Sequence, residues 1–246
     1  MTEHAWMEGR VSVEAAIRGN NRQVERIYFR AGKRDRSLRH LRKIAQSAGI
    51  PVSEVEDEFF VANAGGQSHG GVLARVGPRR FAEIITLVKG ENAPFIVMLD
   101  GIEDPFNFGQ AVRALYAAGI TGLVLRPRNW LSATAVVTRS SAGASELMPT
   151  AIAESALQAA EFFRNAGLVV ACTARESAVS IYHAELTGPM FLLIGGEKRG
   201  ITRSFLEQAD MRLRIPYGRS FDRSLGAAAS TAVIAFEVLR QRSGAQ

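Results

Sequence analysis

The chain has 246 residues, of which 47% are hydrophobic, and a net charge of +6. This composition supplies a sizeable core and excludes an intrinsically disordered chain. The single cysteine, Cys172, excludes an internal disulfide and a thiolate metal cluster, and no apolar run reaches the roughly 18 residues needed to span a bilayer. The N-terminus lacks an apolar signal core, so we expect a cytoplasmic protein.

Helix and strand patterns alternate over the first 80 residues. Residues 8–17 predict a helix entered after Gly9, and residues 24–29, rich in β-branched and aromatic side chains, predict a strand. Ser37 is a candidate N-cap for a helix that ends at Gly49, and strands are expected at 51–55 and 72–76. The order predicts a compact α/β module.

A basic block lies inside this module. Ten Lys and Arg residues fall between Arg18 and Lys43, against only Glu25 and Asp35. Such a block can neutralise several phosphates and indicates a nucleic-acid partner, although a solvated basic surface explains the charge equally well. We take three of its members as candidate RNA contacts: Arg34, Arg36 and Arg39.

The second part of the chain reads as a series of βα units. Apolar strands are predicted at 95–99, 123–126, 168–171 and 191–194, and helices at 108–118, 155–166 and 227–240. Continuous apolar strands separated by helices predict an α/β fold with a mostly parallel sheet covered on both faces. We expect three parts: a domain over 1–80, a linker over 81–92 and a second domain over 93–246.

Three short segments follow strands of the second domain, where small-molecule sites form in α/β sheets. In the first, Asp104–Arg113, Asn107 can cap the next helix and Arg113 falls off its apolar stripe. The second, GGEKRG at 195–200, opens with two glycines that let a ligand approach the backbone. The third joins IPYG at 215–218 to SLG at 224–226, where Ser224 is a candidate helix cap. No phosphate-binding loop or dinucleotide fingerprint is present, which disfavours a nucleotide-dependent enzyme.

In order and spacing these segments resemble the signature motifs of the SpoU (TrmH-like) RNA 2′-O-ribose methyltransferases of the SPOUT class. The resemblance is specific from Phe95 to Arg242. It is looser over the first 80 residues, where Glu8-Gly-Arg10 and Gly70-Gly-Val72 are similar to the family's L30e-like RNA-binding domain. It implies an N-terminal L30e-like substrate-binding domain, a C-terminal SPOUT domain with a trefoil knot, and a homodimer. Ser140–Glu146 also matches a family stretch placed near the active site.

The resemblance implies that S-adenosylmethionine methylates a ribose 2′-hydroxyl in structured RNA, without a metal. Ribosomal RNA is favoured over transfer RNA, because L30e-like modules read RNA shape. A guanidinium stays protonated, which favours an electrostatic role for Arg113. The residues that match the family's site are Asn107, Arg113, Glu197 and Ser224 for catalysis, Gly195, Gly196, Ile215, Pro216 and Leu225 for the cofactor, and Lys198 and Arg199 for RNA phosphate.

Two departures from the family pattern leave alternatives open. The usual Ser-Leu-Asn is Ser224-Leu-Gly226, and the usual Glu-Gly-x-Gly is Glu197-Lys-Arg-Gly200. A non-catalytic RNA-binding paralogue of the same fold is therefore the main alternative. A base methyltransferase of the SPOUT class is a further one, although beyond Glu197 the sequence offers no acidic group for a purine ring nitrogen.

Overall fold

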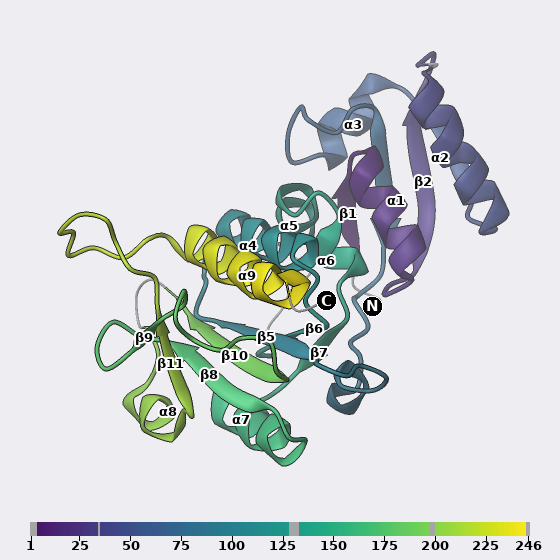
Figure 1. Cartoon of the computed structure of the whole chain (residues 1–246). Coiled ribbons are helices and arrows are strands. Elements are labelled where there is room, and N and C mark those ends of the chain that lie inside the picture. Colours follow the sequence, from purple (N-terminus) through teal and green to yellow (C-terminus); the bar gives the residue numbers. More distant parts are fainter. Residues whose placement is uncertain (1–3, 34, 128–132, 197–199, 245–246) are drawn as a thin grey trace. The chain divides into compact units, whose positions relative to one another are not determined.

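The computed structural model describes residues 4–33, 35–127, 133–196 and 200–244. They form two compact units, neither of which is continuous along the chain. The first unit combines Met1–Arg80 with Asn129–Met148, and the second combines Phe81–Arg128 with Pro149–Gln246 (Figure 1). The sequence analysis places 129–148 in the second domain, so packing and sequence order diverge at this segment. Within the described ranges, no helix has the length and apolar character to cross a membrane.

The first unit is built on a four-stranded sheet with the order β1-β4-β2-β3. Only the β2–β3 pair is parallel. Apolar side chains of the sheet, such as Ile27 and Ala74, pack with α1 and α2 in one buried cluster. The elements are β1 Ala5–Glu8, α1 Arg10–Gly19, β2 Val24–Arg30, α2 Arg36–Ser47, β3 Val52–Val55, α3 Asp57–Asn63, β4 Val72–Val76, α5 Thr134–Ser140 and α6 Ala144–Leu147.

The predicted cap of α2 is wrong. Asp35, not Ser37, accepts the hydrogen bond from the Leu38 N–H, at 2.8 Å. The Ser37 hydroxyl donates to the same carboxylate at 2.6 Å. An ionised carboxylate is the stronger acceptor for the free N–H groups at a helix start, and these hydrogen bonds hold the pKa of Asp35 below its usual value.

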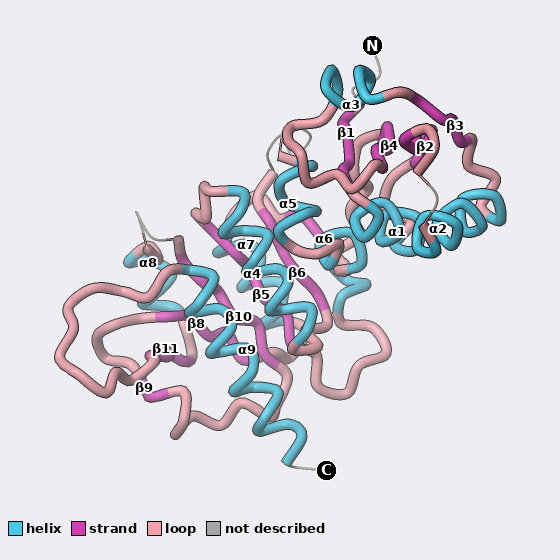
Figure 2. Tube along the Cα trace, turned by 90° about the horizontal axis from the view of Figure 1, so that it is seen from above, coloured by secondary structure: helices cyan, strands magenta, loops and turns pink. Residues whose placement is uncertain are grey.

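The second unit contains a seven-stranded sheet with the order β7-β6-β5-β10-β8-β11-β9, and every pair is parallel. Helices α4 and α9 pack against each other over one face, and α7 covers the other (Figure 2). The expected parallel sheet with two covered faces is confirmed. Its elements are the 3-10 helix η1 Ile84–Leu87, β5 Phe95–Asp100, α4 Pro105–Ala117, β6 Gly122–Leu125, β7 Thr150–Ile152, α7 Ala156–Asn165, β8 Val169–Thr173, β9 Val179–Ser180, β10 Met190–Gly195, α8 Arg203–Gln208, β11 Met211–Arg214 and α9 Ala227–Gly244.

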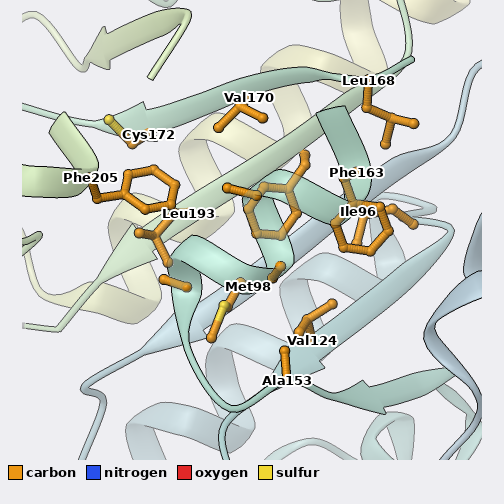
Figure 3. Close-up of a cluster of buried hydrophobic side chains, with 14 of the residues drawn as sticks. Ile96, Met98, Val124, Ala153, Phe163, Leu168, Val170, Cys172, Leu193 and Phe205 are labelled. Atoms are coloured by element: carbon orange, nitrogen blue, oxygen red, sulfur yellow. The ribbon is translucent and has the colours of Figure 1, made fainter. Parts of the chain in front are cut away.

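Aromatic rings fill the core between the sheet and α7. Phe163 of α7 stacks on Phe191 of β10 with ring centroids 4.9 Å apart, and Phe205 of α8 extends the same cluster (Figure 3). Ile96 and Met98 reach this core from β5. Successive strand residues point to opposite faces, so Val97 and Leu99, which alternate with Ile96 and Met98, face α4 and α9.

Two loops of the second unit meet backbone to backbone. Gly196, just after β10, donates its N–H to the carbonyl of Asp100 at 2.7 Å. A Cβ on Gly196 would lie 1.9 Å from the carbonyl oxygen of Gly101, and a Cβ on Gly195 would lie 2.8 Å from the Gly200 backbone. The glycine pair was predicted to admit a ligand; the structure shows that it also admits the neighbouring chain.

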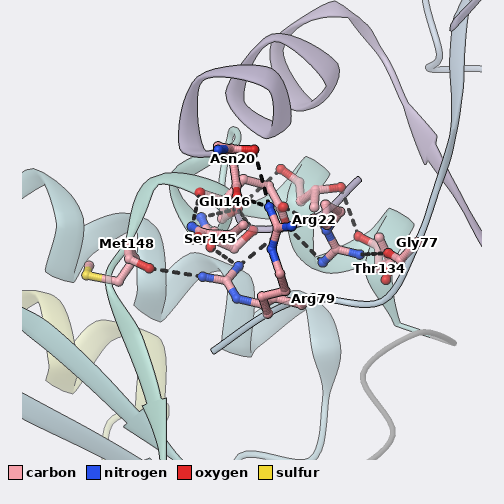
Figure 4. Close-up of polar contacts among 12 residues, drawn as sticks. Asn20, Arg22, Gly77, Arg79, Thr134, Ser145, Glu146 and Met148 are labelled. Atoms are coloured by element: carbon pink, nitrogen blue, oxygen red, sulfur yellow. Dashed lines mark hydrogen bonds and ion pairs between the residues drawn. The ribbon is translucent and has the colours of Figure 1, made fainter. Parts of the chain in front are cut away.

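A buried ionic cluster holds α6 in the first unit. Glu146 is 1% exposed, and Arg22 binds its two carboxylate oxygens at 2.8 and 3.1 Å (Figure 4). Arg79 lies 3.6 Å from the same carboxylate and donates to the carbonyls of Ser145 and, at 2.9 Å, Met148. Burial lowers the pKa of Arg79, while Glu146 opposes that shift. Arg22 is therefore structural, and it does not belong to the exposed basic block in which the sequence placed it.

We expect Glu146→Ala to destabilise the first unit strongly, because it leaves two guanidinium groups without their carboxylate in a buried site. Removing one partner of a buried ion pair typically costs about 3–5 kcal/mol. The free energy of unfolding in urea measures the loss. The matched control is Glu207→Ala, which breaks the exposed Arg203–Glu207 pair and should leave the midpoint almost unchanged. Equal effects of the two variants would contradict the assignment.

Gly196→Ala should prevent the contact between the two loops of the second unit. Its Cβ meets backbone rather than a flexible side chain, so we expect a loss on the order of 3 kcal/mol or more. Thermal unfolding of the purified variant tests this. Gly188→Ala is the control, since a Cβ there has no heavy atom within 4 Å. A Gly196→Ala protein as stable as the control would show that the loops can separate at no cost.

Candidate active site

A cleft of about 990 Å³ opens at the carboxyl edge of the second unit's sheet. Its walls are the segments that follow three neighbouring strands, β10, β8 and β11, together with the start of α9. The carboxyl ends of parallel strands are where α/β sheets form ligand sites. The lining residues that carry the argument below are Arg175, Gly195, Ile215, Tyr217, Ser224 and Leu225.

The cofactor residues implied by the sequence meet at this cleft. Gly195, Gly196, Ile215 and Leu225 line it, and Pro216 lies between two lining residues. The Gly196 N–H and carbonyl are already bonded within the chain, as is the Leu225 N–H, which donates to the Tyr217 hydroxyl at 3.0 Å. To a ligand, Gly196 therefore offers backbone without a side chain, and Leu225 offers an apolar side chain. Neither offers a free N–H group.

The first segment is arranged differently from its prediction. Helix α4 begins at Pro105, and Asp104 is its cap, accepting from the Asn107 N–H at 2.7 Å. The prediction that Asn107 caps the helix is thus wrong, and its side-chain amide is not used for capping. Arg113 is exposed and makes no ion pair with any described residue. Neither Asn107 nor Arg113 lines the cleft of its own chain.

Ser224 lies at the cleft but does not cap α9. The helix begins at Ala227, and the carbonyl of Gly226 accepts its first hydrogen bond from the Ser230 N–H at 3.0 Å. Gly226 therefore occupies the cap position, and Ser224 lies on the exposed loop before it. Glu197, Lys198 and Arg199 lie outside the described residues.

One wall of the cleft was not predicted from the sequence. Residues 173–177, the last residue of β8 and the four that follow it, add Arg175 and Glu176. The available signal was a run of polar residues directly after an apolar strand, the same signal that marks the other two walls. Cys172, one position earlier, is fully buried, and burial raises its pKa to about 11. It is a core thiol rather than a nucleophile, as the sequence predicted.

The exposed basic surface of the first unit is smaller than the sequence suggested. Arg18, Arg30 and Arg42 each pair with a carboxylate. Arg36, Arg39 and Lys43 are exposed at helical spacing along α2, opposite its buried side chains, and pair with no acidic side chain in the described ranges. This stripe is the part of the block suited to a polyanion, and Arg34 lies outside the described residues.

Comparisons with known proteins place both parts of the chain. A model of the SpoU rRNA methylase family matches residues 94–236, and a model described as RNA 2′-O ribose methyltransferase substrate binding matches residues 6–82. The 23S rRNA (guanosine-2′-O-)-methyltransferase RlmB of Pseudomonas putida is 31% identical over 235 residues, which are 94% of each chain.

Two solved structures share the fold. A crystal structure of an RNA 2′-O ribose methyltransferase superposes with a TM-score of 0.81 at 22% identity, covering 98% of this chain and 90% of the other. The AdoMet-bound rRNA methyltransferase of Sinorhizobium meliloti gives a TM-score of 0.80 at 21% identity, covering 96% and 87%.

Neutralising the stripe on α2 should weaken RNA binding and flatten its salt dependence. Each lost phosphate contact removes roughly 0.7–0.9 from the slope of log K against log salt, so Arg36→Ala with Arg39→Ala should lower it by about 1.5. A salt titration of binding to a structured RNA transcript measures this slope. Arg10→Ala with Arg18→Ala removes the same charge from residues that pair with Glu14, and it should change the slope little. Equal slopes for the two double variants would exclude the stripe from the interface.

Proposed function

The chain belongs to the SpoU rRNA methylase family, and from that premise we propose that it methylates the ribose 2′-oxygen of a guanosine in 23S rRNA. The single observation that carries the choice of substrate is the match to RlmB along almost the whole chain, first domain included. We place the enzyme in the cytoplasm with this RNA.

The reaction class expected from the sequence is confirmed. The chain is an RNA 2′-O-ribose methyltransferase that uses S-adenosylmethionine. An enzyme that acts on a nucleobase or on a nucleoside triphosphate is no longer needed to explain the motifs. The family match also favours the enzyme over the non-catalytic paralogue.

The residues that line the cleft suit the cofactor. It combines side-chain-free backbone at Gly195 and Gly196 with the apolar Ile215 and Leu225, and small-molecule sites are built from such apolar walls with few polar groups. When bound, S-adenosylmethionine supplies an electrophilic methyl group. We propose that Gly195, Gly196, Ile215, Pro216 and Leu225 hold it.

A ribose 2′-hydroxyl is a poor nucleophile, so the protein must stabilise the charge that develops on its oxygen. We assign this role to the Arg113 guanidinium, which stays protonated and presents a fork of donors. Asn107 and Ser224 would position the ribose, and Glu197 would orient Arg113. Lys198 and Arg199 would contact RNA phosphate.

We propose that the enzyme is a homodimer built on α4 and α9. Three large apolar side chains are exposed on these two packed helices: Phe106, Tyr116 and Phe236. Arg113 lies on the same face of α4 as Phe106 and Tyr116 at helical spacing. A second copy seated on this face would take Arg113 into the shared interface, which accounts for its absence from the cleft of its own chain.

The division of labour follows the two family models. We propose that residues 1–80 bind RNA, that 81–92 link the domains, and that 93–246 carry the reaction. The matches to 6–82 and 94–236 support these limits. We also retain the trefoil knot of the second domain as a prediction from the family.

Arg113→Ala should lower methyl transfer to a 23S rRNA transcript by at least about 100-fold, the usual effect of removing one group that stabilises developing charge. Cofactor binding, measured by calorimetry, should remain, because Arg113 does not line the cleft. Arg113→Lys keeps the charge without the fork and should give an intermediate rate. Arg203→Ala, at an exposed arginine of the same unit, is the control. Loss of cofactor binding in Arg113→Ala would instead make Arg113 structural.

A further inference from the structure

Two aromatic rings stand exposed at the mouth of the cleft. Tyr217 is 41% exposed and Phe221 is 58% exposed, and both belong to the loop between β11 and α9. Their ring centroids are 6.2 Å apart with planes inclined by 47°. The Tyr217 ring is fixed by the hydrogen bond that its hydroxyl accepts from Leu225. Neighbouring exposed rings beside a ligand cleft mark an interaction site rather than scattered surface.

The charge around these rings is strongly positive. Among the described residues that line the cleft, five are arginines and two are acidic: Arg175, Arg212, Arg214, Arg219 and Arg223 against Glu176 and Asp222. Arg212 and Arg214 donate to the carbonyls of Leu206 and Ala178 and are held in place. Arg219 and Arg223 are exposed and make no ion pair within the described ranges. The rim is thus suited to phosphate groups.

The cleft is also large for its cofactor alone. A volume of about 990 Å³ is at the upper end of small-molecule sites, which span roughly 300–1,000 Å³. The loop that carries Tyr217 and Phe221 lines this cleft together with the proposed cofactor residues.

We infer that Tyr217 and Phe221 form a stacking surface for an unpaired base of the substrate RNA, with Arg219 and Arg223 on the adjoining phosphates. Flat rings interleaved with arginine are the means by which proteins hold single-stranded RNA. A base inside a duplex has both faces covered, so this surface selects an unpaired nucleotide and not a sequence. The inference rests on the proposed function and restricts it: the methylated ribose lies in, or next to, a loop or bulge.

Kinetics with a 23S rRNA transcript test the surface. Stacking on an aromatic side chain is worth a factor of roughly 5 to 150, so Phe221→Ala should reduce kcat/KM by that factor, mainly through KM for RNA. Cofactor affinity should stay within about twofold. Phe221→Leu, which keeps an apolar side chain without a flat ring, should behave like Phe221→Ala, and Phe221→Trp should retain wild-type kinetics. Val169→Ala, at another exposed apolar residue of the unit, is the control.

A binding measurement separates this inference from the proposed function. A hairpin RNA with 2-aminopurine in its loop should lose fluorescence when it binds the wild-type protein. The loss should be smaller with Phe221→Ala. A fully duplex RNA that carries the same 2-aminopurine should show no loss. Quenching without methyl transfer by the wild type would overturn the guanosine assignment and leave the stacking surface standing. If Phe221→Ala transfers methyl groups with the wild-type KM for RNA and quenches the fluorescence as strongly as the wild type, the stacking surface would be overturned. A variant that changes only the sedimentation coefficient would also overturn it, by assigning the rings to a protein interface.

Discussion

The shape of the cleft depends on the close contact between the backbones of Gly196 and Gly101. β5 and β10 are parallel neighbours, and the chain leaves both at the same edge of the sheet. Any side chain on Gly196 would separate the two exits, since a Cβ there overlaps a carbonyl oxygen. The first exit leads into α4, and at the second the Gly196 carbonyl accepts a hydrogen bond from the Gly200 N–H. The contact therefore fixes the ends of two of the three motif segments relative to each other.

Backbone and side chains contribute different parts of the cleft at the carboxyl edge of the sheet. The floor is made of glycines and apolar residues, and the N–H groups of Gly196 and Leu225 are already bonded within the chain, so these two positions offer a ligand shape rather than donors. The rim is made of arginines and two exposed rings, contributed by segments that follow β8 and β11. These segments are distant along the chain and meet only because β10, β8 and β11 are adjacent in the sheet. One edge of the sheet thus combines an apolar floor with a cationic rim.

The long elements could be predicted because their signal is local. Residues 72–76 form a strand with the predicted limits, and the predicted 191–194 lies within β10. Among the short strands, β3 and β6 were predicted at 51–55 and 123–126, whereas β1 and β9 were missed because neither contains a run rich in β-branched residues. The three capping residues were misassigned for one reason. Where several residues can cap, such as Asp104 and Asn107, only the dihedral angles decide.

The site was partly predictable for the same reason. The glycines and the IPYG and SLG segments follow apolar strands and could be placed at the sheet edge, whereas the wall at 173–177 has no motif. Arg22 was assigned to the surface because its partner, Glu146, is 124 residues away and no local pattern reports it. Contacts of that separation are properties of the folded chain, and charge counting along the sequence cannot find them.

The burial of Glu146 between Arg22 and Arg79 has a consequence for biosynthesis. The first unit lacks its last two helices until residues 134–147 have been made, although its sheet is complete at Val76. Chains emerge from the ribosome in order, and domains generally fold as units during synthesis. The nascent first unit therefore lacks the carboxylate of Glu146, which Arg22 and Arg79 face in the folded chain, while β5, α4 and β6 of the second unit are being made. The first unit completes its folding only after residues 134–147, which lie in the sequence between the two segments of the second unit, have been synthesised.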